Sequence, residues 1–208
     1  MQIRCFLLAV ALAACGTASA QSLPRPAEFY FDEDASATRA VVAVSATGDA
    51  AVEQLLKAIE RDPRAAAETA QLAHIAMAGG RPELGRELYA RALRLLGTSD
   101  GLYRPVMWNY GWDLYRTGDH AAALDSWRTL LLSRNVTAQW MPQTLALVLW
   151  TLDRQDEAVQ WYAAAVRTEP RQWRSSEAFA SLLPTWTAEE RATLAEVQAA
   201  WAENPPSW

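Results

Sequence analysis

The sequence predicts an all-α fold in which a pair of helices returns about every 34 residues. The segment Gly118–Trp127 is echoed by Arg154–Val166, where a small residue and a large aromatic each recur 35 positions later. Apolar residues recur at intervals of three and four between glycine- and proline-containing breakers, which is typical of amphipathic helices. Only Phe29–Phe31 alternates as a strand would. A two-helix repeat of this length indicates a solenoid, a fold that presents binding surfaces.

The composition indicates one ordered domain and argues against nucleic-acid binding. The chain has 208 residues, of which 51% are hydrophobic and 21% charged, enough apolar surface for a core. Its net charge is −5, and Lys57 is its only lysine. Because nucleic acids are bound by concentrated basic residues, we expect no nucleic-acid partner.

The first twenty residues are typical of an export signal. Arg4 supplies the positive start, Cys5–Leu12 the apolar stretch, and Ala18-Ser19-Ala20 a small-residue cleavage site before Gln21. An overlapping segment that ends at Cys15, Leu-Ala-Ala-Cys, resembles the lipobox of bacterial lipoproteins, in which the cysteine is lipidated. Two processing routes therefore remain open, and the second would associate the protein with the outer membrane. Either route exports the protein.

Residues 21–34 are predicted to form an extended lead-in. Pro24 and Pro26 disfavour helix around them. We expect Phe29–Phe31 to anchor this segment onto the helical body. The acidic run Asp32–Asp34 is interpreted as complementing the start of a helix rather than as a calcium site.

The predicted second helices share one register, in which a small residue is followed four positions later by a large one. The small residues let neighbouring helices approach, and the large ones fill the space between them. The small positions are Ala51, Gly85, Ala123 and Ala158, and the large ones are Leu55, Tyr89, Trp127 and Tyr162. The repeats occupy 35–172, with units near 32–65, 66–99, 104–137 and 139–172. The first unit requires a leading helix over Thr38–Ser45.

Residues 173–208 are predicted to cap the exposed end of the stack. One helix is expected near Ser175–Leu183. Thr187 and Glu190 have the spacing of a capping box, which opens a second helix running to about Ala202. The tail Asn204–Trp208 is expected to be non-helical.

With this register, the chain resembles the tetratricopeptide-repeat (TPR) family. Gly111 stands at the family's small position of the first helix, and Gly118-Asp119 forms its turn. Ala73 and Ala146 are the matching small residues of the flanking units. The resemblance implies a solenoid of about four repeats that binds a protein or peptide partner in a concave groove.

The chain offers little for catalysis. It has two histidines, and both of its cysteines lie in the predicted leader, so we expect no cysteine nucleophile, no metal site and no cofactor. Gly79-Gly80 is interpreted as an inter-helix turn rather than a phosphate-binding loop. We therefore predict that the protein is not an enzyme.

The candidate binding residues are aromatic, because all ten tryptophans lie between Trp108 and Trp208. In the third unit, Trp108, Trp112 and Tyr115 form a stripe beside the inward-facing one, and Arg116 follows it. Trp150, Trp140 and Leu147 are the matching residues of the fourth unit. In the family this stripe lines the concave groove, which would suit an extended or helical peptide with apolar or proline-rich side chains.

Two interpretations of this stripe stay open. The aromatic residues are either a partner groove or structural packing, and the lead-in itself is a candidate occupant. A clamp for a terminal carboxylate is disfavoured, because Asn109 and Arg116 are its only candidates on these faces.

Three functional hypotheses follow. The first is an exported, periplasm-facing scaffold that binds a protein or peptide partner. The second is a lipid-anchored factor in pilus or outer-membrane assembly. The third is a glycan-binding module, or an accessory subunit of an envelope enzyme, in which tryptophans stack on sugar rings.

Overall fold

The computed structural model describes residues 22–207, and it confirms the all-α prediction. Within that range the β-structure consists of a single bridge between Asp32 and Ala138. The predicted leader and its lipidation candidate Cys15 lie outside the described residues, as does Trp208. The helices are α1 (Gly48–Arg61), α2 (Ala66–Ala78), α3 (Pro82–Leu95), α4 (Tyr103–Arg116), α5 (His120–Leu132), α6 (Met141–Thr151), α7 (Gln155–Thr168), α8 (Pro170–Trp173), the 3₁₀ helix η1 (Ser176–Ala178), α9 (Phe179–Leu182) and α10 (Ala188–Glu203).

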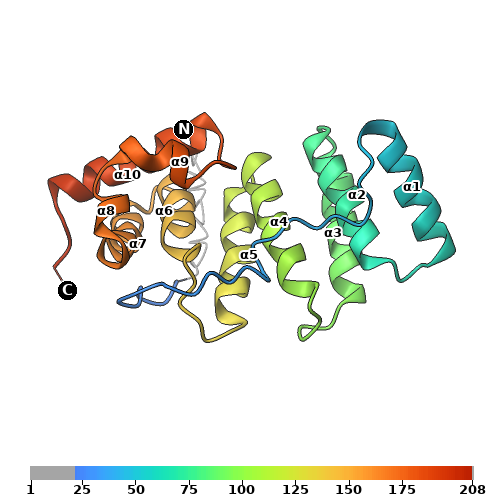
Figure 1. Cartoon of the computed structure of the whole chain (residues 1–208), viewed down its shortest axis with the longest axis horizontal. Coiled ribbons are helices and arrows are strands. Elements are labelled where there is room, and N and C mark those ends of the chain that lie inside the picture. Colours follow the sequence, from blue (N-terminus) through green and yellow to red (C-terminus); the bar gives the residue numbers. More distant parts are fainter. Residues whose placement is uncertain (1–21, 208) are drawn as a thin grey trace, which may run out of the picture.

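Three antiparallel hairpins, α2–α3, α4–α5 and α6–α7, follow one another along the long axis of the molecule (Figure 1). Helix α1 packs on α2 at one end of the row, and α10 packs on α6 and α7 at the other. Residues 22–47 run back along the row. We call the surface that this segment crosses, which includes parts of α2, α4 and α6, the inner face.

The three hairpin turns are built alike. The second residue after each first helix adopts a positive φ: 72° at Gly80, 85° at Gly118 and 58° at Asp153. Glycine adopts this conformation without a steric penalty, and aspartate is among the few other residues that tolerate it. The next backbone N–H then reaches back to a carbonyl five residues earlier, as in a Schellman cap. These bonds are Arg81 N to Ala76 O, Asp119 N to Leu114 O and Arg154 N to Leu149 O, each 2.9 Å long.

The predicted small-and-large register forms the core. All four of the large residues, Leu55, Tyr89, Trp127 and Tyr162, are completely enclosed. Gly111 shows why a small residue is needed opposite them: a Cβ there would lie 2.7 Å from Cδ1 and Cε2 of Trp127. Because protein interiors are close-packed, the indole of Trp127 could not move aside without disturbing its neighbours.

The predicted helix over Thr38–Ser45 is wrong, because this stretch is irregular, with bends at Thr38, Arg39 and Ala43. Its β-branched valines disfavour helix. The side chain of Gln71 also binds the backbone in this non-helical form: its Oε1 accepts from the N–H groups of Ala43 (2.7 Å) and Val44 (2.9 Å), and its Nε2 donates to the Val44 carbonyl (2.8 Å). The lead-in therefore continues to the start of α1, and the first unit has one helix.

The expected anchor Phe29–Phe31 is formed by its middle residue alone. Tyr30 is 3% exposed and its backbone N–H donates to Thr168 Oγ1 at 3.1 Å, whereas Phe29 and Phe31 are 44% and 57% exposed. The two phenyl rings stack on each other, with centroids 5.7 Å apart.

The C-terminal cap agrees with its prediction. The helix expected near Ser175–Leu183 is present as η1 followed directly by α9, and Ser175 is its N-cap, whose side chain accepts from the N–H of Glu177. The capping box at Thr187 and Glu190 is confirmed, and α10 runs from Ala188 to Glu203.

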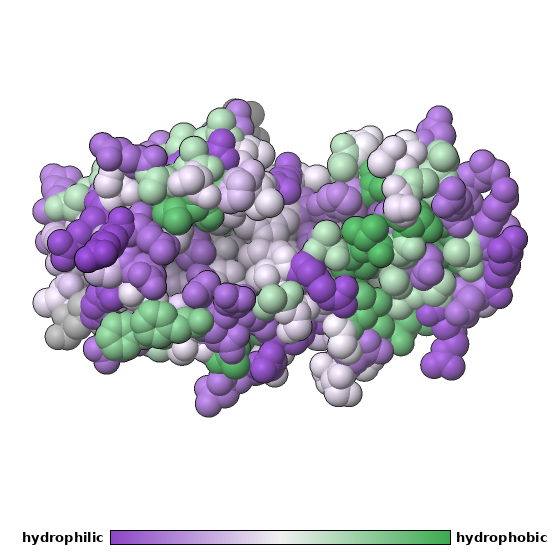
Figure 2. Space-filling view, in the orientation of Figure 1, coloured by the Kyte–Doolittle hydropathy of each residue, from purple (hydrophilic) through white to green (hydrophobic). Residues whose placement is uncertain are grey.

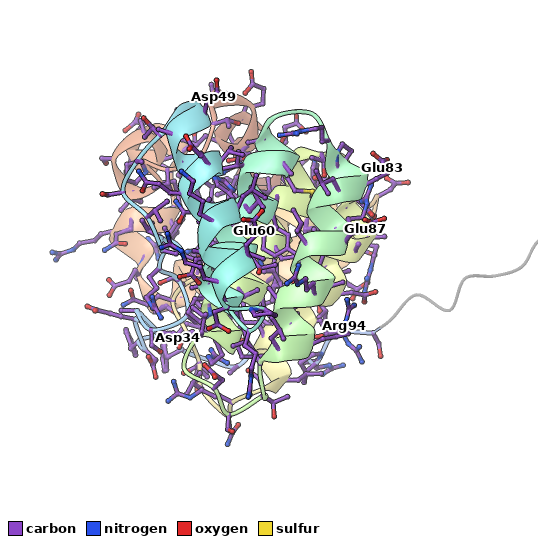
Figure 3. The ribbon with its side chains drawn as sticks, turned by 90° about the vertical axis from the view of Figure 1, so that its right-hand side faces the viewer. Asp34, Asp49, Glu60, Glu83, Glu87 and Arg94 are labelled. Carbon is purple, nitrogen blue, oxygen red and sulfur yellow. The ribbon has the colours of Figure 1, made fainter. Side chains whose placement is uncertain are left out.

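The opposite end of the row is polar, as the end of a solenoid must be. Figure 3 looks onto this end, where Asp49 and Glu60 of α1 and Glu83 and Glu87 of α3 are exposed. Among the helices of the described chain, none has the length and apolar character needed to cross a membrane.

Candidate binding cavity on the inner face

A cavity of about 510 Å³ lies on the inner face, between segments that are far apart in the sequence. Figure 2 shows the middle of this face as a pale, recessed area between the two halves of the molecule. Helices α2, α4 and α6 form the floor, the lead-in forms one wall, and the loop between α9 and α10 forms another. The lining residues are Glu33, Thr38, Ala40, His74, Trp108, Asn109, Trp112, Asp113, Arg116, Gln139, Trp140, Gln143, Thr144, Thr185 and Trp186.

Four indoles follow one another across the cavity, each roughly perpendicular to the next. The centroid of Trp140 lies 5.1 Å from that of Trp108, with 63° between the ring planes. Trp108 and Trp112 are 5.8 Å apart at 82°, and Trp112 and Trp186 are 5.1 Å apart at 67°. Edge-to-face contact is a favoured arrangement of aromatic rings, so each indole stabilises the orientation of its neighbour. The enclosed Trp127 supports Trp108 and Trp112 from beneath, at 6.2 and 5.0 Å.

The structure brings together part of the predicted stripe. Trp108, Trp112, Arg116 and Trp140 line the cavity. Tyr115 lies beneath it, 9% exposed, with its hydroxyl 3.0 Å from Thr151 Oγ1.

The other two predicted residues are displaced from the cavity. Leu147 is completely buried in the core, so the prediction that it lines the groove is wrong. Trp150 lies in a separate depression beside α7 and α10, where its Nε1 donates to Glu196 at 2.9 Å. Helix α10, which packs against α6, accounts for the position of Trp150 through this hydrogen bond.

Two residues from the C-terminal cap, Thr185 and Trp186, belong to the cavity but were missed by the sequence reasoning. They precede the capping box, and no local pattern indicates that this loop returns to α4. An ion pair between α4 and α10 holds this loop against α4. Arg116 donates from Nε to Glu190 Oε1 at 2.8 Å and from an Nη to Oε2 at 3.2 Å, and it also reaches the Thr185 carbonyl at 3.1 Å. The guanidinium carbon lies 5.0 Å from the ring centroid of Trp112.

The opposite wall is held by Asp34, whose side chain is completely buried. Its carboxylate pairs with Arg104 and accepts from the Nε1 of Trp140 at 3.1 Å, while Arg134 lies 3.5 Å away. Asp34 itself adopts a positive φ of 45°. The lead-in and the indole of Trp140 are therefore positioned by the same buried carboxylate.

A third polar cluster lies where α2, α3 and α4 meet. The buried carboxylate of Asp113 is 2.9 Å from Nδ1 of His74 and accepts from the hydroxyl of Tyr89 at 2.6 Å. The hydrogen bond to Asp113 raises the pKa of His74, although partial burial and the nearby Arg116 oppose this rise. Burial, followed by the charge of Asp113, raises the pKa of Tyr89 well above its usual value. Tyr89 therefore acts as a neutral donor, and His74 keeps its proton to higher pH than usual.

A family model for the tetratricopeptide repeat matches residues 143–172, which include most of α6 and all of α7. This part of the chain is a tetratricopeptide repeat, and the packed helix pairs around it are consistent with a solenoid of the same kind. No curated protein and no solved structure matches it. Tetratricopeptide repeats are interaction modules that are generally not catalytic, and the repeat supports a role as a scaffold for protein–protein interaction.

The cavity offers aromatic, hydrogen-bonding and charged groups together. Its four indoles share the lining with amide and hydroxyl side chains and with charged residues such as Glu33 and Arg116. Within residues 22–207, no group of three or more histidine, cysteine, aspartate or glutamate side chains is placed to hold a metal ion.

Replacing Asp34 with asparagine should release the lead-in, because Arg104 would be left in a largely buried site without its counter-charge. Breaking such a pair costs about 3–5 kcal/mol. We expect a loss of that order in the free energy of unfolding in urea, together with faster tryptic cleavage after the exposed Arg39. Glu33→Gln, at an exposed neighbouring position, is the matched control and should leave both unchanged. Wild-type unfolding and cleavage of the Asp34→Asn variant would contradict the assigned role.

The His74–Asp113 pair should make stability depend on pH. Because the pKa of His74 is higher in the folded protein than the usual value of about 6.5, the pair stabilises the fold fully below that pH. Its contribution is lost as the pH rises through the raised pKa. NMR titration should show this raised pKa in the wild type and a lower pKa for His74 in Asp113→Asn. In His74→Gln, the part of the unfolding free energy that declines over this pH range should disappear. An unchanged His74 pKa in Asp113→Asn would exclude the carboxylate as the cause.

Proposed function

We propose that the protein binds an extended segment of a partner protein in the inner-face cavity. The observation that carries this proposal is the series of four indoles along a cavity of about 510 Å³. That volume is within the usual range of ligand pockets, about 300–1,000 Å³. Large, rigid aromatic side chains bury much area at small entropic cost, and they are enriched among the residues that dominate binding energy.

Occlusion by the lead-in is the competing interpretation. The lead-in does cross the inner face, but it contributes only Glu33, Thr38 and Ala40 to the cavity lining. Phe29 and Phe31, which would be the natural plugs, are exposed instead. The lead-in therefore acts as a wall, and the cavity stays open between it and the loop that carries Trp186, with Trp108 as its most exposed indole.

The volume favours an extended segment over a helix. One helical turn with its side chains is about 10–12 Å across and 5.4 Å long, so a single turn would fill the cavity. A longer helix would have to displace the lead-in, which is bound through Asp34, or the loop at Trp186. An extended segment needs neither change.

We also propose that the protein acts outside the cytoplasm, in the cell envelope. The support is the pattern of the first twenty residues, with a cleavage site after Ala20 and a lipidation candidate at Cys15. In both cases the partner would be an envelope protein.

The cavity should be the binding site for peptides selected against the purified protein from a random display library. Trp108→Leu removes a cavity indole, and we expect it to weaken binding at least tenfold, or about 1.4 kcal/mol. Trp150→Leu is the matched control, because Trp150 is also partly exposed but lies outside the cavity. It should change the Kd, measured by calorimetry, less than twofold. A loss of affinity in Trp150→Leu alone, or in neither variant, would place the site elsewhere; circular dichroism checks that each variant is folded.

Deletion of residues 2–20 should retain the protein inside the cell, as measured by fractionation of spheroplasts. Cys15→Ala then separates the two processing routes. If Cys15 carries a lipid, the variant leaves the membrane fraction; unchanged partitioning would end the lipid-anchor hypothesis. Export of the deletion variant would overturn the proposed location.

A further inference from the structure

Two cationic side chains of the cavity are exposed, whereas the carboxylates that pair with them are almost fully buried. The side chain of His74 is 52% exposed, and that of its partner Asp113 is 5% exposed. For Arg116 and its partner Glu190, the exposed fractions are 39% and 5%. The bonds of Arg116 use its Nε and one Nη, so its other Nη makes no hydrogen bond with a residue of the described chain. A ligand in the cavity therefore meets the cations rather than their counter-charges.

Hydrogen bonding at His74 decides which of its ring nitrogens takes up and loses the proton. Nδ1 lies 2.9 and 3.0 Å from the two carboxylate oxygens of Asp113. Because a carboxylate only accepts hydrogen bonds, Nδ1 keeps its hydrogen whether the imidazole is charged or neutral. Nε2 makes no hydrogen bond with any residue in 22–207. It is consequently a donor when His74 is charged and an acceptor when His74 is neutral.

The charged and titratable groups around His74 come from α3, α4 and the lead-in, and they are Tyr89, Asp113, Arg116, Glu33 and Arg39. Asp113 favours the protonated form of His74, and the nearby charge of Arg116 opposes it. Tyr89 stays neutral and donates to Asp113. A negative charge bound near both cations would reduce their mutual repulsion. The exposed carboxylate of Glu33 belongs to the lead-in wall, so an anion is favoured on the side of α2 and α4.

The part of the cavity formed by α6 offers neutral hydrogen-bonding groups. Thr144 is 1% exposed and Gln143 is partly buried, and neither side chain makes a hydrogen bond with a residue that the structure describes. The hydroxyl of Thr144 is not one of the enclosed polar atoms without a partner, so it borders the open volume. A buried polar group without a partner is costly. These groups therefore suit a polar ligand, such as the backbone of an extended segment.

We infer that the cavity binds an internal acidic side chain of the partner, aspartate or glutamate, through Nε2 of protonated His74, and releases it when this nitrogen loses its proton. The inference rests on the proposed function. A carboxylate accepts from a charged N–H donor, and it is repelled by the lone pair of a neutral imidazole. The free Nη of Arg116 adds a second cationic donor. Two such donors suit the carboxylate of one side chain better than a chain end, which would need a larger set.

The test uses peptides selected from the display library at pH 6, free of histidine and blocked at both ends, with Kd measured by calorimetry. We expect replacement of one internal aspartate or glutamate by its amide to weaken binding to the wild-type protein at least fivefold. Peptide carboxylates have a pKa of about 4, so they stay ionised at pH 6 and above. The affinity of the acidic peptide should therefore fall as the pH rises through the pKa that NMR gives for His74, and that of the amide peptide should not.

The protein variants separate His74 from other sources of pH dependence. His74→Gln cannot become charged, so it should bind the acidic and the amide peptide alike at every pH. His120→Gln is the matched control, because His120 lies against Tyr115 and does not line the cavity. It should keep the full pH dependence. In Asp113→Asn, where the pKa of His74 is expected to be lower, the fall in affinity should begin at lower pH. Circular dichroism checks that each variant is folded, and the comparison of the two peptides needs only the wild type.

The remaining outcomes separate the inference from the proposed function. If the peptides depend on Trp108 but bind equally well as acid and amide, or equally well across the pH range, the inference fails and the proposed function stands. Tightening by at least tenfold with a free C-terminal carboxylate would also overturn it, in favour of recognition of chain ends. If chito-oligosaccharides quench the tryptophan fluorescence and no peptide binds, both proposals fail in favour of a glycan site.

Discussion

The cavity depends on the buried carboxylate of Asp34. A charge without solvent is costly unless it is paired, so this side chain holds the lead-in on Arg104 of α4 and on Trp140 at the start of α6. The lead-in is also attached on either side of Asp34. Asp32 forms a bridge with Ala138, and Gln71 binds the backbone of Ala43. Because the lead-in can lie in only one register, its residues form a defined wall.

A second carboxylate plays the matching role on the other side. Glu190 comes from the C-terminal cap and binds Arg116, as Asp34 comes from the lead-in and binds Arg104. These two arginines stand near opposite ends of α4, twelve residues or about 18 Å apart along the helix. Two segments from outside the repeats are therefore attached to one helix, and Trp108 and Trp112 lie between the attachments. The inner face becomes a bounded cavity because of this arrangement.

Local patterns were enough to predict most of the fold. The pairing of small and large residues around Trp127 and the capping box at Thr187 depend on neighbours within a helix or a turn, so the sequence displays them directly. The errors come from distant partners. Ala43 and Val44 are non-helical because Gln71 of α2 binds their backbone. Trp150 has the same helical spacing as the stripe residues but lies outside the cavity, where it binds Glu196 of α10.

The sequence left two roles open for the tryptophans, structural packing and partner binding. One ring can serve both roles, because one side of it can pack on the core while another borders the cavity. Trp112 rests on the enclosed Trp127 and borders the cavity with what remains of its surface. Core side chains normally close up until no space remains. Here the walls are held by ion pairs at Arg104 and Arg116, so the indoles pack rigidly and an open volume remains beside them. A rigid site loses little conformational entropy when it binds. The packing of the aromatic rings would therefore raise the affinity of this small cavity for a partner.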